Sequence, residues 1–212
     1  MKPVKDFQLT KDSVKDLVSQ MLQSGGFTSK KLAESVVILQ DMLKEKDCLK
    51  FISFPADIIA TGTRGVIKEF VRRKMFDIII TTCGTLDHDI ARSFKEYYHG
   101  SFDMDDADLH RRGINRLGNI LVPNESYGEV IEDKMREWLK ELEREGKNEL
   151  STYELCWEIG KRLKQDSILY WAWKNGIPVI VPGITDGAVG YQLWQFQQTH
   201  PFKIDLFEDE KM

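Results

Sequence analysis

The chain has 212 residues, of which 42% are hydrophobic and 30% are charged, the composition of a globular protein that can bury a core without a stabilising disulfide or metal. Thirty basic residues against 34 acidic ones give a formal charge of −4, which disfavours nucleic acid as a partner because such proteins present a basic face. The three cysteines are widely spaced and form no Cys-x-x-Cys pair, so we expect no metal site and reduced thiols in a cytoplasm.

The first fifty residues are predicted to form an N-terminal helical segment, 1–50. The opening sequence MKPVKDFQLT lacks the apolar core of a signal peptide, and no apolar run in the chain approaches about 18 residues, the length that a membrane span needs. Residues 28–43 begin with Thr28, which we interpret as a helix cap, and then place leucine and valine on one helical face. We therefore expect helices here, no association with a membrane and a cytoplasmic location.

Short apolar runs alternate with helical patterns in the remainder of the chain, 51–212. We interpret three of these runs as buried strands: LKFISF at 49–54, DIIITT at 77–82 and IPVIVPG at 177–183. Such alternation predicts an α/β domain with a mostly parallel sheet that is covered by helices on both faces. The last run, FKIDLFEDEKM, ends where a further helix and strand are expected, so we expect this domain to be incomplete at its C-terminus.

The middle of the chain carries mainly helical and loop patterns. The acidic run at 103–108 is interpreted as a solvated loop, and residues 113–130 as a long structured loop with one short strand at its centre. An amphipathic helix with a charged outer face is predicted over 126–149. Ser151, followed three residues later by glutamate, forms a capping box, and Gly176 is expected to end the helix before the third strand.

Three aspartates, Asp57, Asp87 and Asp186, each follow one of the predicted strands. Because the carboxyl ends of parallel strands meet at one edge of a sheet, the three loops predict one binding site. An aspartate there can bind a ribose diol or an ammonium group, although each could equally be a helix N-cap. Glycines in these loops would allow close approach of a ligand, but no Gly-x-Gly-x-x-Gly fingerprint occurs. These features alone predict an α/β protein that binds a nucleotide or another small polar ligand.

Two residues after the second strand have competing interpretations. His88 stands between two acids and could act as a general base, or it could be a solvent-facing helix residue. Cys83 directly follows the buried strand, and because no base partner is evident we interpret it as a packed residue rather than a nucleophile.

Several long motifs follow one another in the order found in deoxyhypusine synthases: SFPADIIATGTRG, DIIITTCGTLDHDIARSF, GINRLGNILVPNESYGEVIE and ILYWAWKNGIPVIVPGITDGAVGYQLW. The chain resembles the archaeal members of this family along essentially its whole length. The resemblance implies a Rossmann-like, NAD-dependent transferase that is usually a homotetramer. It also implies transfer of the 4-aminobutyl group of spermidine, through an enzyme lysine, to a lysine of the hypusine-containing translation factor.

The resemblance also implies roles for individual residues at positions that match the family's motifs. Asp87 and His88 are implied to lie near the polyamine, and Tyr191 stands where some relatives have an aspartate for its ammonium group. The residues implied to contact NAD are Ala56, Asp57, Ile58, Ile59, Ala60, Thr82, Cys83, Gly84, His88 and Asp186. The family's reactive lysine lies in a Gly-Gly-Gly-x-x-Lys-His segment that has no match in residues 1–212. We therefore expect no catalytic residue among them and no aminobutyl transfer by this chain alone.

Two other functions remain open at this point. The chain could be a non-catalytic partner subunit that completes or regulates a synthase whose C-terminal part is supplied by a second chain. It could also be another NAD-binding enzyme of related fold, such as a sirtuin-like deacylase. The absence of a paired-cysteine zinc site disfavours that last interpretation.

Overall fold

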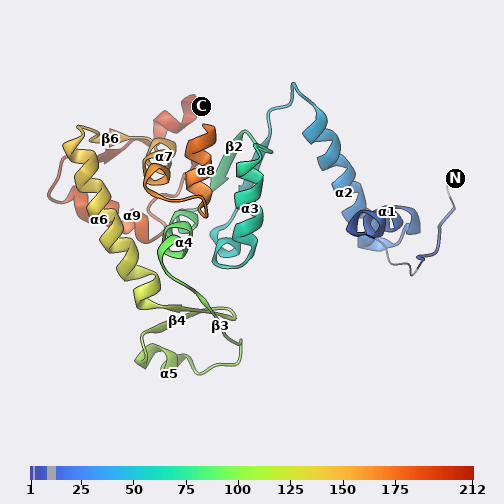
Figure 1. The fold of residues 1–212 in the computed structure, drawn as a ribbon, viewed down its shortest axis with the longest axis horizontal. Helices are drawn as coiled ribbons and strands as arrows, with labels where there is room; N and C mark the ends of the chain where they lie inside the picture. The colour runs from blue at the N-terminus through green and yellow to red at the C-terminus, as the bar shows by residue number, and fades with distance from the viewer. Residues whose placement is uncertain (2, 9–12) are drawn as a thin grey trace. The chain divides into compact units, whose positions relative to one another are not determined.

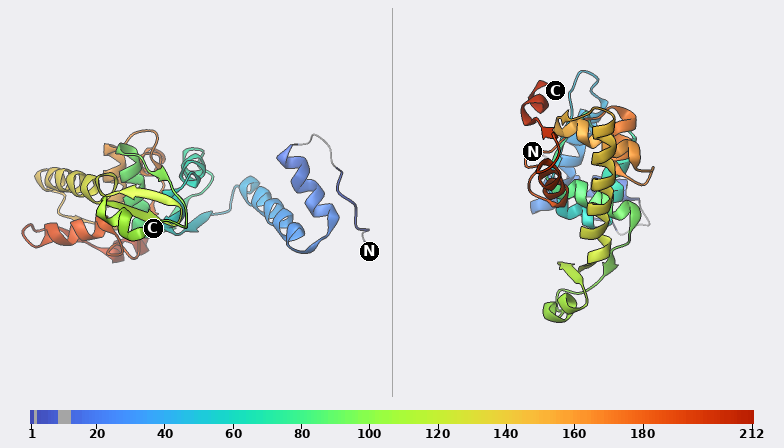
Figure 2. Two further views of the ribbon diagram at one scale, coloured as in Figure 1. Left: turned by 90° about the horizontal axis from the view of Figure 1, so that it is seen from below. Right: turned by 90° about the vertical axis from the view of Figure 1, so that its left-hand side faces the viewer.

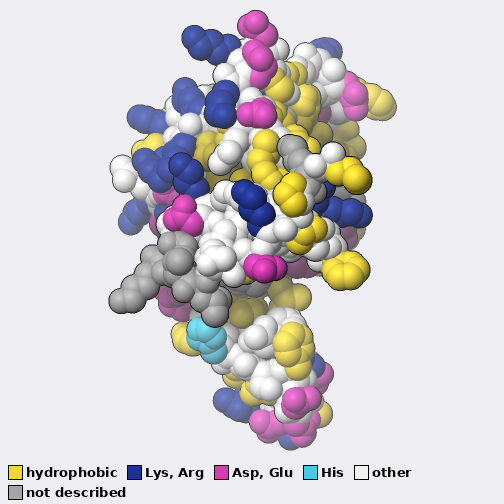
Figure 3. All heavy atoms as spheres, turned by 90° about the vertical axis from the view of Figure 1, so that its right-hand side faces the viewer, with side chains coloured by type: hydrophobic (Ala, Val, Ile, Leu, Met, Phe, Trp, Pro, Cys, Tyr) yellow, Lys and Arg dark blue, Asp and Glu magenta, His cyan; other side chains and the backbone are white. Residues whose placement is uncertain are grey.

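The computed structural model describes residues 1, 3–8 and 13–212, and these form two compact units, Met1–Leu49 and Lys50–Met212 (Figure 1). The first unit is a pair of helices, α1 (Val14–Ser24) and α2 (Phe27–Lys44). Among the described residues of the two helices Ala33 alone is buried, and many of their hydrophobic side chains stay exposed (Figure 3). Residues 2 and 9–12 of the predicted helical segment lie outside the described residues.

Local capping explains where the two N-terminal helices begin. Ser13 forms a capping box with Asp16 at the start of α1, and Gly25, with φ of 68°, makes the turn between the helices. The prediction that Thr28 caps the second helix is wrong, because α2 begins at Phe27 and Gly26 occupies the cap position without a side-chain bond.

A three-stranded parallel sheet forms the centre of the second unit and confirms the predicted α/β class. Its strands are β1 (Phe51–Phe54), β2 (Ile78–Thr81) and β7 (Val179–Ile180), in the spatial order β1-β2-β7. Alternate side chains on one face of this sheet, such as Ile79, are fully buried in the core, whereas Phe51 on the other face is 52% exposed.

Helices pack around this sheet and carry most of the core (Figures 1 and 2). They are η1 (Ala56–Ala60), α3 (Thr63–Arg72), α4 (Cys83–Phe94), α6 (Gly128–Arg144), α7 (Thr152–Arg162), α8 (Ile168–Asn175) and α9 (Ala188–Gln197). The capping box at Ser151 and the C-cap at Gly176, with φ of 68°, are confirmed. Helix α6 is shorter than predicted at both ends, because a 3-10 turn, η2 (Asn124–Ser126), precedes it and Gly146, with φ of 74°, follows its C-cap.

A small antiparallel sheet lies beyond the N-terminal end of α6 (Figure 1). It comprises β3 (Tyr98–His99), β5 (Ile120–Pro123) and β4 (Ile114–Leu117), in that order. The short strand predicted within 113–130 is confirmed as β5, but its partner β4 was not predicted. Gly118, with φ of 60°, and Asn119 make the two-residue turn that pairs the two strands.

The acidic run at 103–108 is only partly a loop. Asp105 caps the helix α5 (Asp106–Arg111) by accepting hydrogen bonds from two backbone N–H groups. Acidic and basic side chains gather around α5 at the bottom of Figure 3.

The C-terminal residues add β8 (Lys203–Ile204), which pairs in parallel with β6 (Glu149–Leu150), and the 3-10 helix η3 (Leu206–Lys211). Across residues 1, 3–8 and 13–212, no helix combines the length and the apolar character that crossing a bilayer requires. The cytoplasmic location stays a prediction.

Candidate functional site

All three parallel strands end at one edge of the sheet, and an open hollow lies there. Its lining is mainly apolar and comes from the ends of the three strands: Ser53, Phe54, Pro55, Ile80, Thr81, Thr82, Pro182 and Gly183. Ligands of open parallel sheets bind outside the carboxyl ends of the strands. The hollow therefore lies where the sequence predicts a site.

The first two strand-end loops touch each other directly. The backbone N–H of Ala56 donates to Thr82 Oγ1 at 3.1 Å, and Thr81 Oγ1 donates to the carbonyl of Phe54 at 2.7 Å. A Cβ atom added at Gly84 would lie 2.8 Å from the Cβ of Ala56. Only glycine at this position lets the start of α4 approach η1 so closely, which explains one of the glycines in the predicted loops.

Helix α4 also fixes the first loop through Arg92. Its guanidinium donates from Nη1 to the carbonyl of Ile59 at 2.8 Å and to the carbonyl of Thr61. Two carbonyls at the end of η1 are thereby held by one half-buried cation, and burial lowers the pKa of this group. The loop that the resemblance assigns to NAD is therefore anchored to the helix after β2.

The third loop is joined to α4 by Asp87, whose side chain is fully buried. Its carboxylate accepts hydrogen bonds from the N–H groups of Ala188, at 2.9 Å, and Val189, at 2.8 Å, and from the hydroxyl of Tyr127 at 2.6 Å. Burial raises the pKa of Asp87, the three donors lower it, and the negative charge of Asp186 raises it. Asp87 is thus the N-terminal cap of α9, a helix about a hundred residues further along the chain.

Asp89, two residues further along α4, caps another helix in the same way. It accepts from Ser167 Oγ at 2.7 Å and from the N–H groups of Ile168 and Leu169, which begin α8. Arg64 of α3 donates to the same carboxylate at 2.8 Å. No side-chain nitrogen or oxygen buried among the described residues lacks a hydrogen-bond partner. Helix α4 therefore holds α3, α8, α9 and η1 in fixed positions.

His88 lies between these two aspartates and faces a cluster of aromatic rings. Its Nδ1 atom is 2.9 Å from the hydroxyl of Tyr97, and its ring centroid is 5.4 Å from that of Tyr127. Burial, followed by the charge of Arg92, lowers the pKa of His88 to about 4, although Asp57 opposes this. The imidazole is therefore neutral near pH 7, and its second ring nitrogen has no hydrogen bond within the described chain.

Cys83 is fully buried at the start of α4, as predicted for a packed residue, and burial raises the pKa of its thiol to about 12. Cys156 is also fully buried, and its pKa is raised well above the ordinary value for the same reason. Cys48 is half-buried.

We therefore expect an aromatic disulfide reagent at pH 8 to modify at most Cys48 rapidly in the folded protein, because only a thiolate attacks such a reagent. All three thiols should react after denaturation in guanidinium chloride. Rapid modification of Cys83 in the folded protein, located by peptide mass spectrometry, would contradict this placement.

The remaining predicted NAD contacts differ in how they face the edge of the sheet. Asp57, Thr82 and Asp186 are exposed, whereas the side chains of Ile59 and Ala60 are buried and could meet a ligand only through their backbone. The other members, Ala56, Ile58 and Gly84, are half-buried. The fold brings all of these loops to one edge, while their contacts with NAD stay a prediction.

Three residues of this site were missed by sequence reasoning: Arg92, Tyr97 and Tyr127. Arg92 contacts the first strand-end loop, Tyr97 contacts His88, and Tyr127 contacts Asp87, as described above. Arg92 and Tyr127 lie in long motifs that carry the family resemblance, but those motifs gave no indication of the contacts that the two side chains make. Tyr97 lies outside the quoted motifs.

The residues at this edge fit a dinucleotide. Helix α4 begins there, and its N-cap residue Thr82 makes no side-chain cap hydrogen bond, so the first backbone N–H groups of α4 are free to bind phosphate. At the start of α3, by contrast, the N–H groups of Thr63 and Arg64 donate to Oγ1 and to the carbonyl of Thr61. The exposed carboxylates of Asp57 and Asp186 are acceptors that suit ribose hydroxyl groups. Within the part of the chain that the structure describes, no cluster of histidine, cysteine, aspartate or glutamate forms a metal site.

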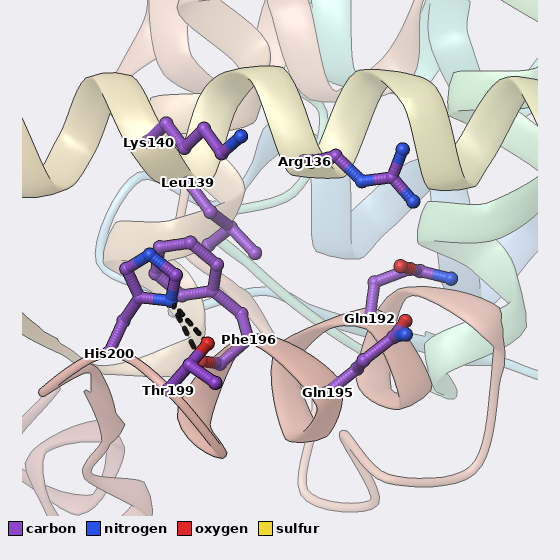
Figure 4. Close-up of a pocket in the computed structure, with 8 residues that line it drawn as sticks. All are labelled: Arg136, Leu139, Lys140, Gln192, Gln195, Phe196, Thr199 and His200. Carbon is purple, nitrogen blue, oxygen red and sulfur yellow. Dashed lines mark hydrogen bonds between the residues drawn. The ribbon is translucent and has the colours of Figure 1, made fainter.

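A second hollow lies between α6 and α9, which pack side by side (Figures 2 and 4). His200 stacks on Phe196 with ring centroids 3.9 Å apart, and the amides of Gln192 and Gln195 line the same hollow. None of the residues predicted to bind a cofactor or substrate lines this hollow. It is therefore separate from the candidate site at the sheet edge.

Comparisons with known proteins agree on one family. The family model described as deoxyhypusine synthase matches residues 16–212. A probable deoxyhypusine synthase of Picrophilus torridus is 53% identical over 98% of this chain and 67% of its own length. Another, from Thermoplasma acidophilum, is 54% identical over 99% of this chain and 68% of its own length. A crystal structure from Entamoeba histolytica, described under the same enzyme name, shares the fold with a TM-score of 0.70 at 21% identity, over 98% of this chain and 72% of that one.

Proposed function

Because the chain belongs to the deoxyhypusine synthase family, a family of transferases in hypusine biosynthesis, we propose that it acts in NAD-dependent transfer of the 4-aminobutyl group of spermidine. The acceptor is a lysine of the hypusine-containing translation factor. One observation carries the proposal: three loops from separate parts of the chain meet at the carboxyl edge of a parallel sheet, with the free N-terminus of α4 and two exposed carboxylates.

In this proposal NAD is held by the loops Ala56–Ala60 and Thr82–Gly84 together with His88 and Asp186. Bound NAD would supply the hydride acceptor and donor of the reaction. Asp57 and Asp186 accept hydrogen bonds from hydroxyl groups of the nucleotide, and the N–H groups at the start of α4 bind its phosphates. Arg92 keeps the first loop in the conformation that these contacts need.

The polyamine lies next to His88, with Asp87 behind it. A neutral imidazole does not repel an ammonium group, and its second ring nitrogen can accept a proton from the amine that loses the hydride. The bond to Tyr97 orients the ring for this task. No group in residues 1–212 is assigned as the lysine that carries the aminobutyl group. The resemblance places that lysine in the Gly-Gly-Gly-x-x-Lys-His segment, which has no match in residues 1–212.

Binding of NAD is the first test of this proposal. We expect isothermal titration calorimetry to detect NAD binding by the wild-type protein. The variant Asp186→Asn should raise Kd about tenfold, since about 1.4 kcal/mol is within the range for one hydrogen bond to a charged group. The matched control Asp133→Asn changes an exposed aspartate on α6 and should leave Kd unchanged. A wild-type protein that does not bind NAD would refute the proposal.

Transfer is tested with labelled spermidine and the purified translation factor. We expect no label on the factor when the polypeptide of residues 1–212 is the only enzyme present, because no lysine in it matches the reactive segment. Label that appears only when a second polypeptide carrying that segment is added would favour the role of partner subunit. Labelling of the factor by residues 1–212 alone would show that the enzyme lysine that carries the aminobutyl group lies among them.

A further inference from the structure

One buried carboxylate joins three helices directly beside the loop that carries Asp186. Asp87 of α4 receives two hydrogen bonds from the first N–H groups of α9 and one from Tyr127, at the start of α6. Both of its oxygens are occupied, and its side chain has no exposed surface. Three donors offset the cost of burying this charge, and they leave no direction from which a soluble ligand can reach it.

The contact with Asp87 fixes the backbone of the turn that precedes α9. A Cβ atom added at Gly187 would lie 2.6 Å from Asp87 Oδ2 and 2.9 Å from Cys83 Sγ, so the backbone of this residue packs directly against the carboxylate. The N–H of Asp186 donates to the carbonyl of Gly183 at 3.0 Å and closes the turn. Because Gly187 packs against Asp87 and directly follows Asp186, the position of Asp87 determines the position of the exposed Asp186 carboxylate.

Tyr127 also fixes the position of the Asp87 carboxylate, from the start of α6. Its hydroxyl is the one side-chain donor to Asp87 among the described residues, and at 2.6 Å the bond has the length of a charge-assisted one. Its ring also contacts His88, so one side chain borders both the cap of α9 and the proposed substrate side of the site.

We propose that Asp87 and Tyr127 are positioning residues, which hold the start of α9 and thereby the Gly183–Gly187 turn in the geometry that binds NAD. Asp87 then acts through α9 and does not itself contact a ligand. The inference rests on the proposed function, because it assigns a task within the same site. It differs from the sequence interpretation, in which Asp87 binds the polyamine directly.

The structure offers a matched control for a purely stabilising effect. Ser167 donates to Asp89 as Tyr127 donates to Asp87: each hydroxyl bonds a fully buried aspartate of α4 that caps another helix. The helix in the control is α8, which carries none of the predicted NAD contacts. Tyr127→Phe and Ser167→Ala thus each remove a hydroxyl bond to a capping aspartate at a different helix start, and Ser167→Ala also removes the N-cap bond that Ser167 accepts from the N–H of Tyr170.

The test measures NAD affinity by calorimetry, thermal stability and amide hydrogen exchange in the wild-type protein and both variants. We expect Tyr127→Phe to raise the Kd for NAD about tenfold, the equivalent of about 1.4 kcal/mol. The amides of Ala188 and Val189 should then exchange faster. Ser167→Ala should lower the melting temperature and speed exchange at Ile168 and Leu169, with Kd for NAD unchanged.

The outcomes separate the two proposals. An unchanged Kd in Tyr127→Phe, with NAD binding by the wild type intact, would overturn the positioning role and leave the proposed function standing. Equal rises in Kd in both variants would also overturn it, because general loosening of the fold would then explain the effect. A wild-type protein that does not bind NAD would overturn both.

Discussion

Replacing Asp89 by alanine is expected to lower the free energy of unfolding by about 3–5 kcal/mol, the cost of removing one partner from a buried ion pair. The side chain of Asp89 is fully buried, and Arg64, whose side chain is only 11% exposed, would lose its counter-charge. Two N–H groups at the start of α8 and the hydroxyl of Ser167 would lose their acceptor in the same step. The effect is large because one carboxylate satisfies four donors from two elements, α3 and the start of α8.

Urea denaturation followed by circular dichroism measures this loss. The control is Asp106→Ala, which breaks the ion pair with Arg116 on the small antiparallel sheet, where the carboxylate is 66% exposed. Solvent screens an exposed pair, so we expect the control to have a far smaller effect. Similar losses in the two variants would show that the network around Asp89 is not the support of α3 and α8 that we describe.

The elements that the sequence predicted correctly are those with local signals. The three parallel strands are short apolar runs rich in β-branched residues, a pattern that is typical of strands inside a sheet. Ser151 and Glu154 are three residues apart, so their capping box is visible in the sequence, and the structure contains both of its hydrogen bonds. In such cases the residues that interact are neighbours along the chain.

The supporting contacts of the site are long-range and could not be predicted in this way. Asp87 was recognised as an aspartate at a strand end, with capping as one alternative, but the helix it caps is not its own. Asp209 caps α7 across 57 residues in the same manner. An aspartate that caps a distant helix has no sequence pattern around it, because the geometry arises only when the helices pack.

The same limit applies to the difference between the three predicted site aspartates. Nothing in the sequence distinguishes Asp87 from Asp57 and Asp186, yet the first is fully buried and the other two are exposed. Burial depends on which elements cover each loop, and α6 and α9 cover the second loop only in the folded chain. The sequence therefore predicted the edge of the sheet where the site lies, but not which of its carboxylates can meet a ligand.

Gly190→Ala is the substitution for which we expect the largest effect on NAD binding. A Cβ atom at Gly190 would lie 1.9 Å from the carbonyl oxygen of Ile184 and 2.8 Å from Thr185 Cα, and both contacts are with backbone. Backbone atoms cannot rotate away as a flexible side chain can, so α9 and the turn before it must separate. We expect a loss of stability of about 1–3 kcal/mol, as for other overpacked sites. The Kd for NAD should rise by more than about tenfold, because a displacement of this turn exceeds what the loss of one hydrogen bond causes.

The control is Gly128→Ala, at the first residue of α6, where an added Cβ meets no atom within 4 Å. Alanine is favoured over glycine in a helix by up to about 1 kcal/mol, so this variant should be as stable as the wild type or slightly more so. Calorimetry and thermal melts of both variants distinguish a role of Gly190 in stability alone from a role in shaping the nucleotide site. If Gly190→Ala melts early yet binds NAD with the wild-type Kd at a temperature where it is folded, the turn before α9 is not part of the nucleotide site. If its Kd rises while Gly128→Ala keeps the wild-type value, the close approach of α9 to Ile184 is what places Asp186 at the edge of the sheet.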